Sequence, residues 1–339
     1  MEIGIYTFAD VPVGHPELAG QRLRNLVEEM KLADEVGLDV FAVGEHHRAD
    51  YAASAPPVVL AAGAAVTKRI RLSSAVTVLS SDDPVRAFQQ FATVDGISNG
   101  RAEIMAGRGS FIESYPLFGY DLDDYDALFS EKLDLLMKLR ESERITWAGK
   151  LRPSLNNAGI YPRPEQKKMP IWIAVGGTPQ SVVRAATLDL PMALAIIGGD
   201  PRRFKPFYDL YREAHAKAGH DPKTIQLSLN MHGFVSDTTE NAKRVYGAAQ
   251  MEVMNRIGKE RGWPPQGMDH FERSTQDDGN LIVGDAARVT DRILQLHEVF
   301  ENTRILIQMA IGTVPHAEQL KAIEILGGEV APAVRKALK

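Results

Sequence analysis

Short apolar runs alternate with longer amphipathic segments along this chain of 339 residues, and this alternation constrains the fold more than any single motif. The runs have the length and β-branched content of strands, whereas the longer segments place apolar residues at helical spacing. Eight strands are expected, at Ile3–Phe8, Val40–Gly44, Ile70–Leu79, Ala102–Ala106, Pro170–Val175, Met192–Ile197, Ile225–Val235 and Arg304–Ala310. A strand followed by a helix, repeated eight times, predicts an α/β protein with a closed parallel sheet, the (β/α)8 or TIM barrel.

The chain is longer than a bare barrel of about 250 residues, so we expect one domain over residues 1–339 with loop insertions. Two irregular stretches, 107–119 and 141–170, follow the fourth strand. A third, 262–280, follows the seventh strand and combines many turn residues with no regular period. It reads as a mobile loop that could act as a lid.

Composition excludes several classes of function. The formal charge of −5 and the absence of a lysine-arginine stripe argue against a nucleic-acid or anionic-membrane surface. The chain has no cysteine, which excludes disulfides, Fe–S clusters and cysteine nucleophiles. No secretory signal or long apolar span is visible, so we expect a cytoplasmic protein with no membrane partner.

Two adjacent histidines, His46 and His47, follow the second expected strand, and Glu45 precedes them. In a barrel of this kind the carboxyl ends of the strands carry the active site. Histidine has an unperturbed pKa of about 6.5, which lets it exchange a proton near neutral pH. We therefore take His46 as the candidate catalytic residue. The alternative is a hydrogen-bonded structural histidine, and that interpretation is preferred for His47.

Two glycine clusters at other strand ends suggest a phosphate site. Arg108 lies between Gly107 and Gly109, where a guanidinium can bind a phosphate or carboxylate in bidentate fashion. The turn Gly176-Gly177-Thr178 precedes Pro179 and an expected helix, whose free N–H groups favour an anion. The alternatives are a solvated surface turn and an ordinary capped turn. Neither cluster fits a Rossmann or P-loop pattern.

Five motifs in this order make the chain resemble the luciferase-like flavin-dependent monooxygenases, which include bacterial luciferase and the alkanesulfonate monooxygenases. The motifs are Gly44–His47, Leu72–Leu79 followed by Asp83–Arg86, Ile97–Arg101, Gly107–Gly109 and Ala174–Pro179. The resemblance implies a TIM barrel that takes reduced FMN from a separate NAD(P)H-dependent flavin reductase. It also implies a reaction of that FMN with O2 to form a C4a-peroxyflavin.

Carried over residue by residue, the resemblance makes His46 the active-site histidine, with Glu45 and His47 in support. It places a non-proline cis peptide at Ala75-Val76, against the flavin ring. The cofactor-binding residues that it implies are Glu45, Ala75, Val76, Gly107, Arg108, Gly176, Gly177, Thr178 and Gln180. The chain departs from luciferase at Gly107, where luciferase has a cysteine. It also departs in the Gly176–Thr178 turn, where luciferase has acidic and hydroxyl residues. These departures argue against aldehyde chemistry and light emission but leave flavin binding intact.

Three other functions stay open. A barrel metallohydrolase gathers histidines from several strands, whereas the first strand here has none and only His232 lies on another; no metal is expected. An F420-dependent dehydrogenase shares the resembling fold but generally lacks the Glu-His-His run. A non-catalytic flavin-binding protein would keep the motifs without turnover.

The substrate is expected to be a small, partly apolar organic molecule. The loops after strands four and seven combine few cations with several aromatic residues, namely Phe111, Tyr115, Phe118, Trp263 and Phe271. The alternative is that these aromatic residues only pack the loops. Arg273 is the one lid cation that could meet an anionic group. The family's usual state implies a homodimer.

Overall fold

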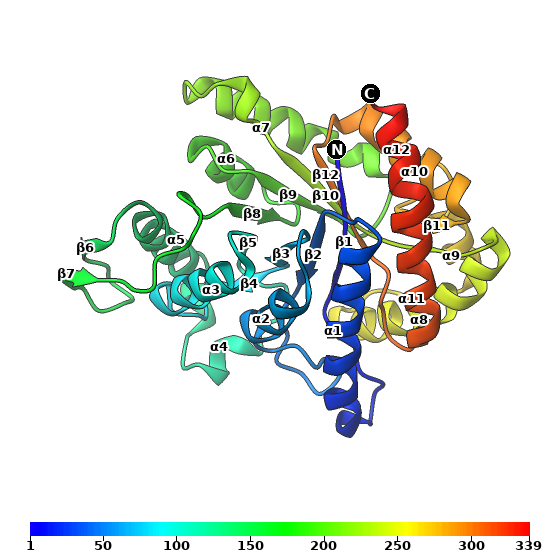
Figure 1. Ribbon diagram of the computed structural model, residues 1–339, viewed down its shortest axis with the longest axis horizontal. Coiled ribbons are helices and arrows are strands. Elements are labelled where there is room, and N and C mark those ends of the chain that lie inside the picture. Colours follow the sequence, from blue (N-terminus) through cyan, green and yellow to red (C-terminus); the bar gives the residue numbers. More distant parts are fainter.

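The computed structural model describes residues 1–339 and contains a closed sheet of parallel strands (Figure 1). Closure is complete because β10 pairs with both β9 and β12, and β12 pairs with β1. The eight barrel strands are β1 (Glu2–Thr7), β2 (Val40–Val43), β3 (Arg71–Ser74), β5 (Ala102–Gly107), β8 (Ile171–Val175), β9 (Met192–Ile196), β10 (Leu227–Val235) and β12 (Arg304–Gln308). The predicted TIM barrel and each of its eight strands are therefore confirmed.

Helices cover the outside of the barrel (Figure 1). The long ones are α1 (Ala19–Glu35), α2 (Pro56–Val66), α3 (Pro84–Ser98), α5 (Tyr125–Glu141), α6 (Pro179–Thr187), α7 (Lys205–Lys217), α8 (Thr239–Arg261), α10 (Ala286–Phe300) and α11 (His316–Ile325). The shorter ones are α4 (Ser114–Leu117), α9 (Met268–Ser274) and α12 (Ala331–Ala337). Local chemistry sets their ends. Asp83 caps α3 through the N–H groups of Val85 and Arg86, and Gly37 follows α1 with a φ of 82°.

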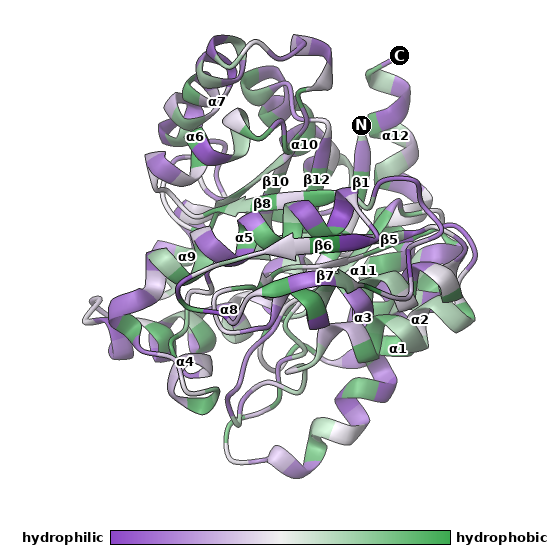
Figure 2. Ribbon diagram, turned by 90° about the vertical axis from the view of Figure 1, so that its left-hand side faces the viewer, coloured by the Kyte–Doolittle hydropathy of each residue, from purple (hydrophilic) through white to green (hydrophobic).

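Side chains along each strand alternate between two cores, as the period of two requires. On β1, Ile3 and Ile5 face the helices and belong to a core of 70 buried residues. Tyr6, together with Met105 and Trp172 from other strands, belongs to a second core of eight residues inside the barrel. The helices show alternating hydrophobic and hydrophilic bands in Figure 2, which fits one face packed on the sheet.

The third expected strand is divided into β3 and a two-residue strand, β4 (Thr77–Val78). Between them lies the Ala75-Val76 peptide, which is cis. Side chains replace the interrupted backbone pairing. The Ser74 hydroxyl accepts a hydrogen bond from the Met105 N–H at 3.0 Å and another from the Thr77 hydroxyl at 2.9 Å. The divided strand therefore stays attached to β5, which also pairs with β4.

Several elements were not expected from the sequence, among them the short helix α4 within 107–119. Residues 141–170 contain an antiparallel hairpin of β6 (Arg144–Trp147) and β7 (Leu155–Gly159), which projects from one side of the barrel in Figure 1. Strand β11 (Leu281–Gly284) pairs with β10 outside the closed ring. Residues 262–280, expected to be irregular throughout, contain α9, which is too short to show a helical period.

Helix α9 changes the interpretation of the expected lid. Phe271 is fully buried, and a Cβ on Gly247 of α8 would lie 2.9 Å from its ring. Lys243 of α8 also binds Glu272 at 2.6 Å. Phe271 therefore anchors α9 to α8 instead of lining a substrate pocket, and Arg273 lies exposed on the same helix.

A buried ion pair lies at the amino-terminal end of the barrel. Arg304, at the start of β12, donates to both carboxylate oxygens of Glu103 on β5, at 2.7 and 3.1 Å. Glu2 binds the same guanidinium at 2.6 Å, and the Trp172 ring lies 4.2 Å from it. These contacts satisfy the charges buried at this end of the barrel, beside a cavity of about 490 Å³ that Glu2, Glu103 and Arg304 also line.

Replacing one partner of this pair is expected to destabilise the fold strongly. Arg304→Ala should lower the free energy of unfolding by about 3–5 kcal/mol, because Glu103 would stay buried with only the half-exposed Arg71 nearby. Urea unfolding followed by circular dichroism measures this loss. Arg212→Ala, which breaks the exposed pair with Glu301, is the control and should cost about 1 kcal/mol or less. Equal losses in the two variants would contradict the prediction.

Candidate functional site

The sequence-predicted residues meet at the carboxyl rim of the barrel. Because the strands are parallel, their carboxyl ends share one side. Glu45–His47 follow β2, Ala75-Val76 follows β3, Gly107-Arg108 ends β5, and Gly176–Thr178 follow β8. The structure therefore gathers these segments around one end of the barrel, although they come from four separate parts of the chain.

His46 lies in an aromatic enclosure at this rim. The centroid of its imidazole is 4.5 Å from those of Phe8 and Tyr51 and 4.7 Å from that of Phe111. The residue is 7% exposed, and its ring forms no hydrogen bond with another protein group. Burial lowers the pKa of His46 to about 3, although the nearby Asp50 carboxylate opposes the shift. His46 is therefore a neutral imidazole with both ring nitrogens available to a ligand.

Glu45 and His47 hold the loop after β2 in place through contacts with each other and with neighbouring segments. His47 Nε2 lies 2.8 Å from Glu45 Oε1, and the other oxygen of Glu45 accepts the Val78 N–H at 3.1 Å. The His47 ring also packs edge-on against Phe118, with centroids 5.1 Å apart. This arrangement ties the end of β2 to β4. It fits the structural interpretation of His47.

Two glycines allow close packing around the Ala75-Val76 peptide. A Cβ on Gly44 would lie 2.6 Å from the Ala75 carbonyl oxygen, and a Cβ on Gly107 would lie 2.7 Å from a methyl group of Val76. Any other residue at either position would displace this peptide. The cis bond is where the family resemblance places it. Gly107, which replaces the cysteine of luciferase, therefore makes room for Val76.

Arg108 and Thr178, which the sequence predicts to bind an anion, are in contact with each other. Arg108 Nη2 donates to the Thr178 hydroxyl at 2.8 Å, and Nη1 lies 2.5 Å from the Asp126 carboxylate. The Arg108 guanidinium also lies 5.2 Å from the Tyr125 ring. Thr178 precedes α6 without capping it, because its hydroxyl is bound to Arg108 and to Ser181 at 3.0 Å. Arg108 and the turn before α6 therefore act together, although 70 residues separate them.

The turn before α6 has free backbone donors. The N–H groups of Gly177, Thr178 and Gln180 donate to no protein acceptor, and nothing lies within 4 Å of a Cβ built on Gly176 or Gly177. Such a turn at the positive end of a helix favours an anion. Gln180 is exposed in the first turn of α6.

Several contacts of this region were not identified from the sequence, which named Phe111 only as an aromatic residue of its loop. Arg48 binds Glu113 at 2.9 Å and Glu260 at 2.6 Å, which joins the loops after β2 and β5 to the end of α8. Phe111 lies between Arg48 and Arg261, whose guanidiniums are 4.9 and 5.3 Å from its ring. These cations therefore hold Phe111 against His46. Strand periodicity could not reveal these contacts, because Arg48, Phe111 and Arg261 all lie beyond the strands.

The other strand histidine, His232 on β10, is buried in the barrel. Burial lowers its pKa to about 4, and its Nδ1 has no hydrogen-bond partner. The structure brings no group of three His, Asp or Glu side chains into an arrangement suited to a metal ion. None of its helices is both long and apolar enough to cross a membrane.

Sequence comparison places the chain in a known family. A family model described as luciferase-like monooxygenase matches residues 1–302. The chain therefore belongs to the luciferase-like monooxygenases. It is 27% identical over 336 residues to the uncharacterized protein y4vJ of Sinorhizobium fredii, covering 96% of this chain and 95% of that one. It is also 27% identical to the N-acetyl-S-alkylcysteine monooxygenase of Bacillus subtilis, over 73% of this chain and 72% of the relative.

Solved structures share the fold at lower identity. The monooxygenase RslO1 from Streptomyces bottropensis has a TM-score of 0.86 and 24% identity, covering 98% of this chain and 99% of its own. The oxygenating constituent of 3,6-diketocamphane monooxygenase from Pseudomonas putida, in complex with FMN, has a TM-score of 0.79 and 20% identity, covering 98% of each chain. A coenzyme F420-dependent tetrahydromethanopterin reductase from Methanopyrus kandleri has a TM-score of 0.75 and 19% identity, also with 98% of each chain covered.

The neutral state of His46 has a measurable consequence. The folded protein binds the His46 proton only near pH 3, whereas the unfolded chain binds it near 6.5. The stability that this neutral imidazole contributes is therefore present above pH 6.5 and is lost as the pH falls toward 3. Ring 15N shifts should show no titration of His46 between pH 8 and 5. His316, whose pKa is raised by hydrogen bonds to Glu29 and Glu28, is the control and should titrate at a higher pH. A His46 midpoint near 6.5 would show instead that solvent reaches the ring.

Proposed function

We propose that this family member is a two-component monooxygenase that uses reduced FMN and O2. The observation that carries the proposal is the geometry of the rim. An anion site of Arg108 and Thr178, a glycine-flanked peptide at Ala75-Val76 and a buried neutral His46 surround one end of the barrel. Together they suit a ligand with a phosphate at one end and a flat uncharged ring system at the other.

The residues present fit FMN. Arg108, the Thr178 hydroxyl and the free N–H groups of the turn would hold its phosphate. The surface at Ala75-Val76, which Gly44 and Gly107 keep free of side-chain bulk, would support its ring system. When bound in reduced form, FMN supplies the two electrons that the reaction with O2 needs.

The protein's own contribution would be to exclude water and place one hydrogen-bonding group. Phe8, Tyr51 and Phe111 surround the His46 imidazole, and Arg48 holds Phe111 in place. Burial holds the pKa of His46 at about 3, well below the 6.5 on which the sequence argument for proton exchange rested. His46 would therefore act as a neutral hydrogen-bonding group, which donates from one ring nitrogen and accepts at the other beside the reacting atom. Glu45 and His47 would support the FMN pocket by fixing the loop.

The substrate and partners follow from the same proposal. The aromatic enclosure favours a small, partly apolar organic substrate. Reduced FMN would come from a separate NAD(P)H-dependent flavin reductase. We also propose a cytoplasmic location and a homodimer.

F420-dependent hydride transfer is the second candidate. It is favoured by the fold shared with the F420-dependent reductase and by 33% identity to an F420-dependent glucose-6-phosphate dehydrogenase of Amycolatopsis mediterranei, over 45% of this chain and 48% of that one. A third possibility is flavin binding without turnover, and oxygen reactivity distinguishes it from the monooxygenase.

Anaerobic titration of the protein with FMN, reduced FMN and F420 tests these functions. We expect reduced FMN to bind most tightly. After mixing with oxygenated buffer, the absorbance of oxidised flavin should return more slowly than for reduced FMN alone, because the aromatic enclosure limits access of water. Tight F420 binding without reaction with oxygen would instead support the F420-dependent dehydrogenase function. Flavin binding with reoxidation as fast as in free solution would favour the non-catalytic alternative.

Variants of the enclosure make this test specific. His46→Ala should accelerate the return of oxidised flavin and increase hydrogen peroxide release. His220→Ala, which changes a histidine beyond the end of α7 that binds the Thr187 carbonyl, is the control and should behave as the unmodified protein. The role of His46 would be wrong if both variants reoxidised at the same rate.

The Arg108–Asp126 contact predicts opposite effects of two variants on affinity for reduced FMN. Asp126 is largely exposed and competes with a phosphate for the Arg108 guanidinium. Asp126→Asn should therefore bind reduced FMN up to about threefold more tightly, in line with the small energies of exposed ion pairs. Arg108→Ala should bind about tenfold or more weakly, since a charge-assisted phosphate contact contributes more. Fluorescence titration under anaerobic conditions measures both. Unchanged affinity in Arg108→Ala would place the phosphate elsewhere.

A further inference from the structure

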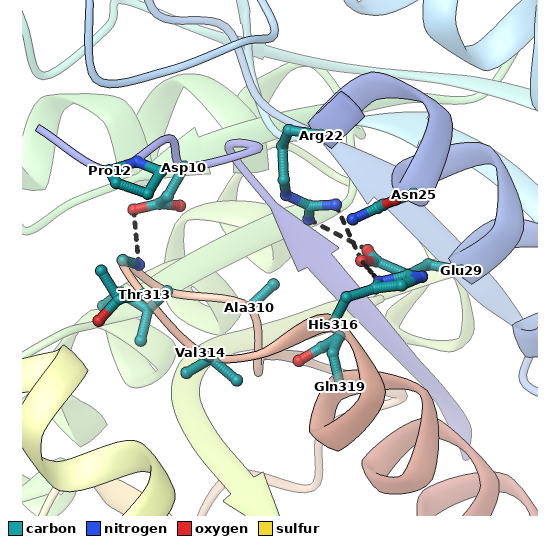
Figure 3. A pocket seen from close by; sticks show the side chains of 12 residues that line it. Asp10, Pro12, Arg22, Asn25, Glu29, Ala310, Thr313, Val314, His316 and Gln319 are labelled. Atoms are coloured by element: carbon teal, nitrogen blue, oxygen red, sulfur yellow. Dashed lines mark hydrogen bonds and ion pairs between the residues drawn. The ribbon is translucent and has the colours of Figure 1, made fainter. Parts of the chain in front are cut away.

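A polar cavity lies beyond the carboxyl ends of β1 and β12 (Figure 3). Its walls are the loop after β1, one face of α1 and the segment that joins β12 to α11, and its volume is about 170 Å³. None of the residues of the proposed FMN site lines it. The flavin function proposed above therefore does not account for this cavity.

Two buried acceptors line the cavity without a hydrogen-bond donor. Asp10 is 5% exposed; one carboxylate oxygen accepts the Gly312 N–H at 3.0 Å, and the other, Oδ2, has no partner. Gln319, on α11, is 3% exposed, and its Oε1 also lacks a donor. Figure 3 shows Asp10 and Gln319 on opposite sides of the cavity. Buried acceptors without donors are unfavourable, so the cavity calls for a molecule with donors at both ends.

The cations of the cavity already have carboxylate partners. Arg22 donates to both oxygens of Glu29, at 2.8 and 3.1 Å. His316 lies between Glu28 and Glu29, at 2.9 and 3.3 Å. Asp10 forms no ion pair with a cation of the cavity. Burial raises the pKa of its carboxyl to about 6, and the Gly312 N–H together with the nearby Arg22 and Arg256 opposes that shift. At neutral pH its carboxylate can therefore attract a positive charge.

We infer that this cavity binds a short amino alcohol or a similar small amine, with its ammonium on Asp10 and a second donor on Gln319. A water molecule occupies about 30 Å³ in the liquid, so the cavity has room for roughly five non-hydrogen atoms. An ammonium offers three donors and a full charge to the Asp10 carboxylate. A hydroxyl at the far end supplies the donor that Gln319 lacks.

The cavity is connected to the loop that carries His46. The Val11 N–H donates to the Asp50 carbonyl, and the Ala52 N–H donates to the Ala9 carbonyl, each at 2.9 Å. These bonds pair the segment around Asp10 with the segment around Tyr51, whose ring contacts His46. A ligand on Asp10 would therefore also change the ring signals of His46, which gives a second readout.

Isothermal titration calorimetry of the protein without added flavin tests the inference. Three ligands with five non-hydrogen atoms each separate the contributions: 3-aminopropan-1-ol, propane-1,3-diol, which lacks the charge, and butylammonium, which lacks the second donor. At constant ionic strength, 3-aminopropan-1-ol should bind with one-to-one stoichiometry. Propane-1,3-diol should bind at least tenfold more weakly, and butylammonium several-fold more weakly.

Three variants assign the contacts. Asp10→Asn keeps an acceptor for Gly312 but removes the charge, and should weaken binding of 3-aminopropan-1-ol at least tenfold. Gln319→Leu should weaken it several-fold and abolish the advantage over butylammonium. Asp291→Asn changes an exposed carboxylate on α10 and is the control, with unchanged affinity.

No saturable binding at millimolar concentration would overturn the inference and leave a cavity filled by water alone. Equal affinity of Asp10→Asn and the unmodified protein would overturn it as well. If Asp10→Asn failed to fold, the three-ligand series and Gln319→Leu would still show whether the cavity binds an amino alcohol. No flavin is present in these experiments, so their outcome is independent of the FMN proposal.

Discussion

Hydrogen bonds from β10 to both β9 and β12 close the parallel sheet, and this closure decides which end of the molecule can hold a ligand. In a closed parallel sheet every strand ends on the same rim, so short motifs far apart in sequence come together there. The Arg304–Glu103 pair and the Trp172 ring lie at the opposite end, beside a cavity of about 490 Å³. The predicted site residues are therefore gathered on the rim, while the buried ion pair stabilises the other end.

The barrel could be predicted from the sequence because its strands are buried on both faces and stand out as separate, largely apolar runs. The elements that escaped prediction depend on contacts between distant segments. Helix α9 is fixed by the Phe271 ring against Gly247, and β11 is a four-residue strand that depends on pairing with β10. The β6–β7 hairpin lies in a segment rich in turn residues; β6 alternates polar and apolar residues over only four positions, and β7 does not alternate. Short elements carry too little local signal to be recognised without their neighbours.

The residues of the candidate site likewise fall into those that could be predicted from the sequence and those that could not. Glu45, His46, Arg108 and the Gly176–Thr178 turn could be predicted, because their position at a strand end already implies a place on the rim. The side chains around them could not be predicted from spacing. Phe111 reaches His46 from the loop after β5, and Asp126 reaches Arg108 from α5. The Asp10 cavity was also missed, since its two unpartnered acceptors lie about 300 residues apart and no local pattern connects them.

The cost of burying charge explains how these parts are arranged around the rim. His46 and His232 are both buried, and burial lowers the pKa of each, which favours the neutral imidazole. Arg108 keeps its charge where Asp126 and solvent can reach it. A ligand with a charged end and an uncharged flat end would lower its free energy in only one orientation, with the charge at Arg108 and the flat part toward His46. The proposed position of FMN thus follows from desolvation as much as from individual contacts. The same cost explains why the Asp10 carboxylate, buried without an ion pair in its own cavity, calls for a positively charged partner.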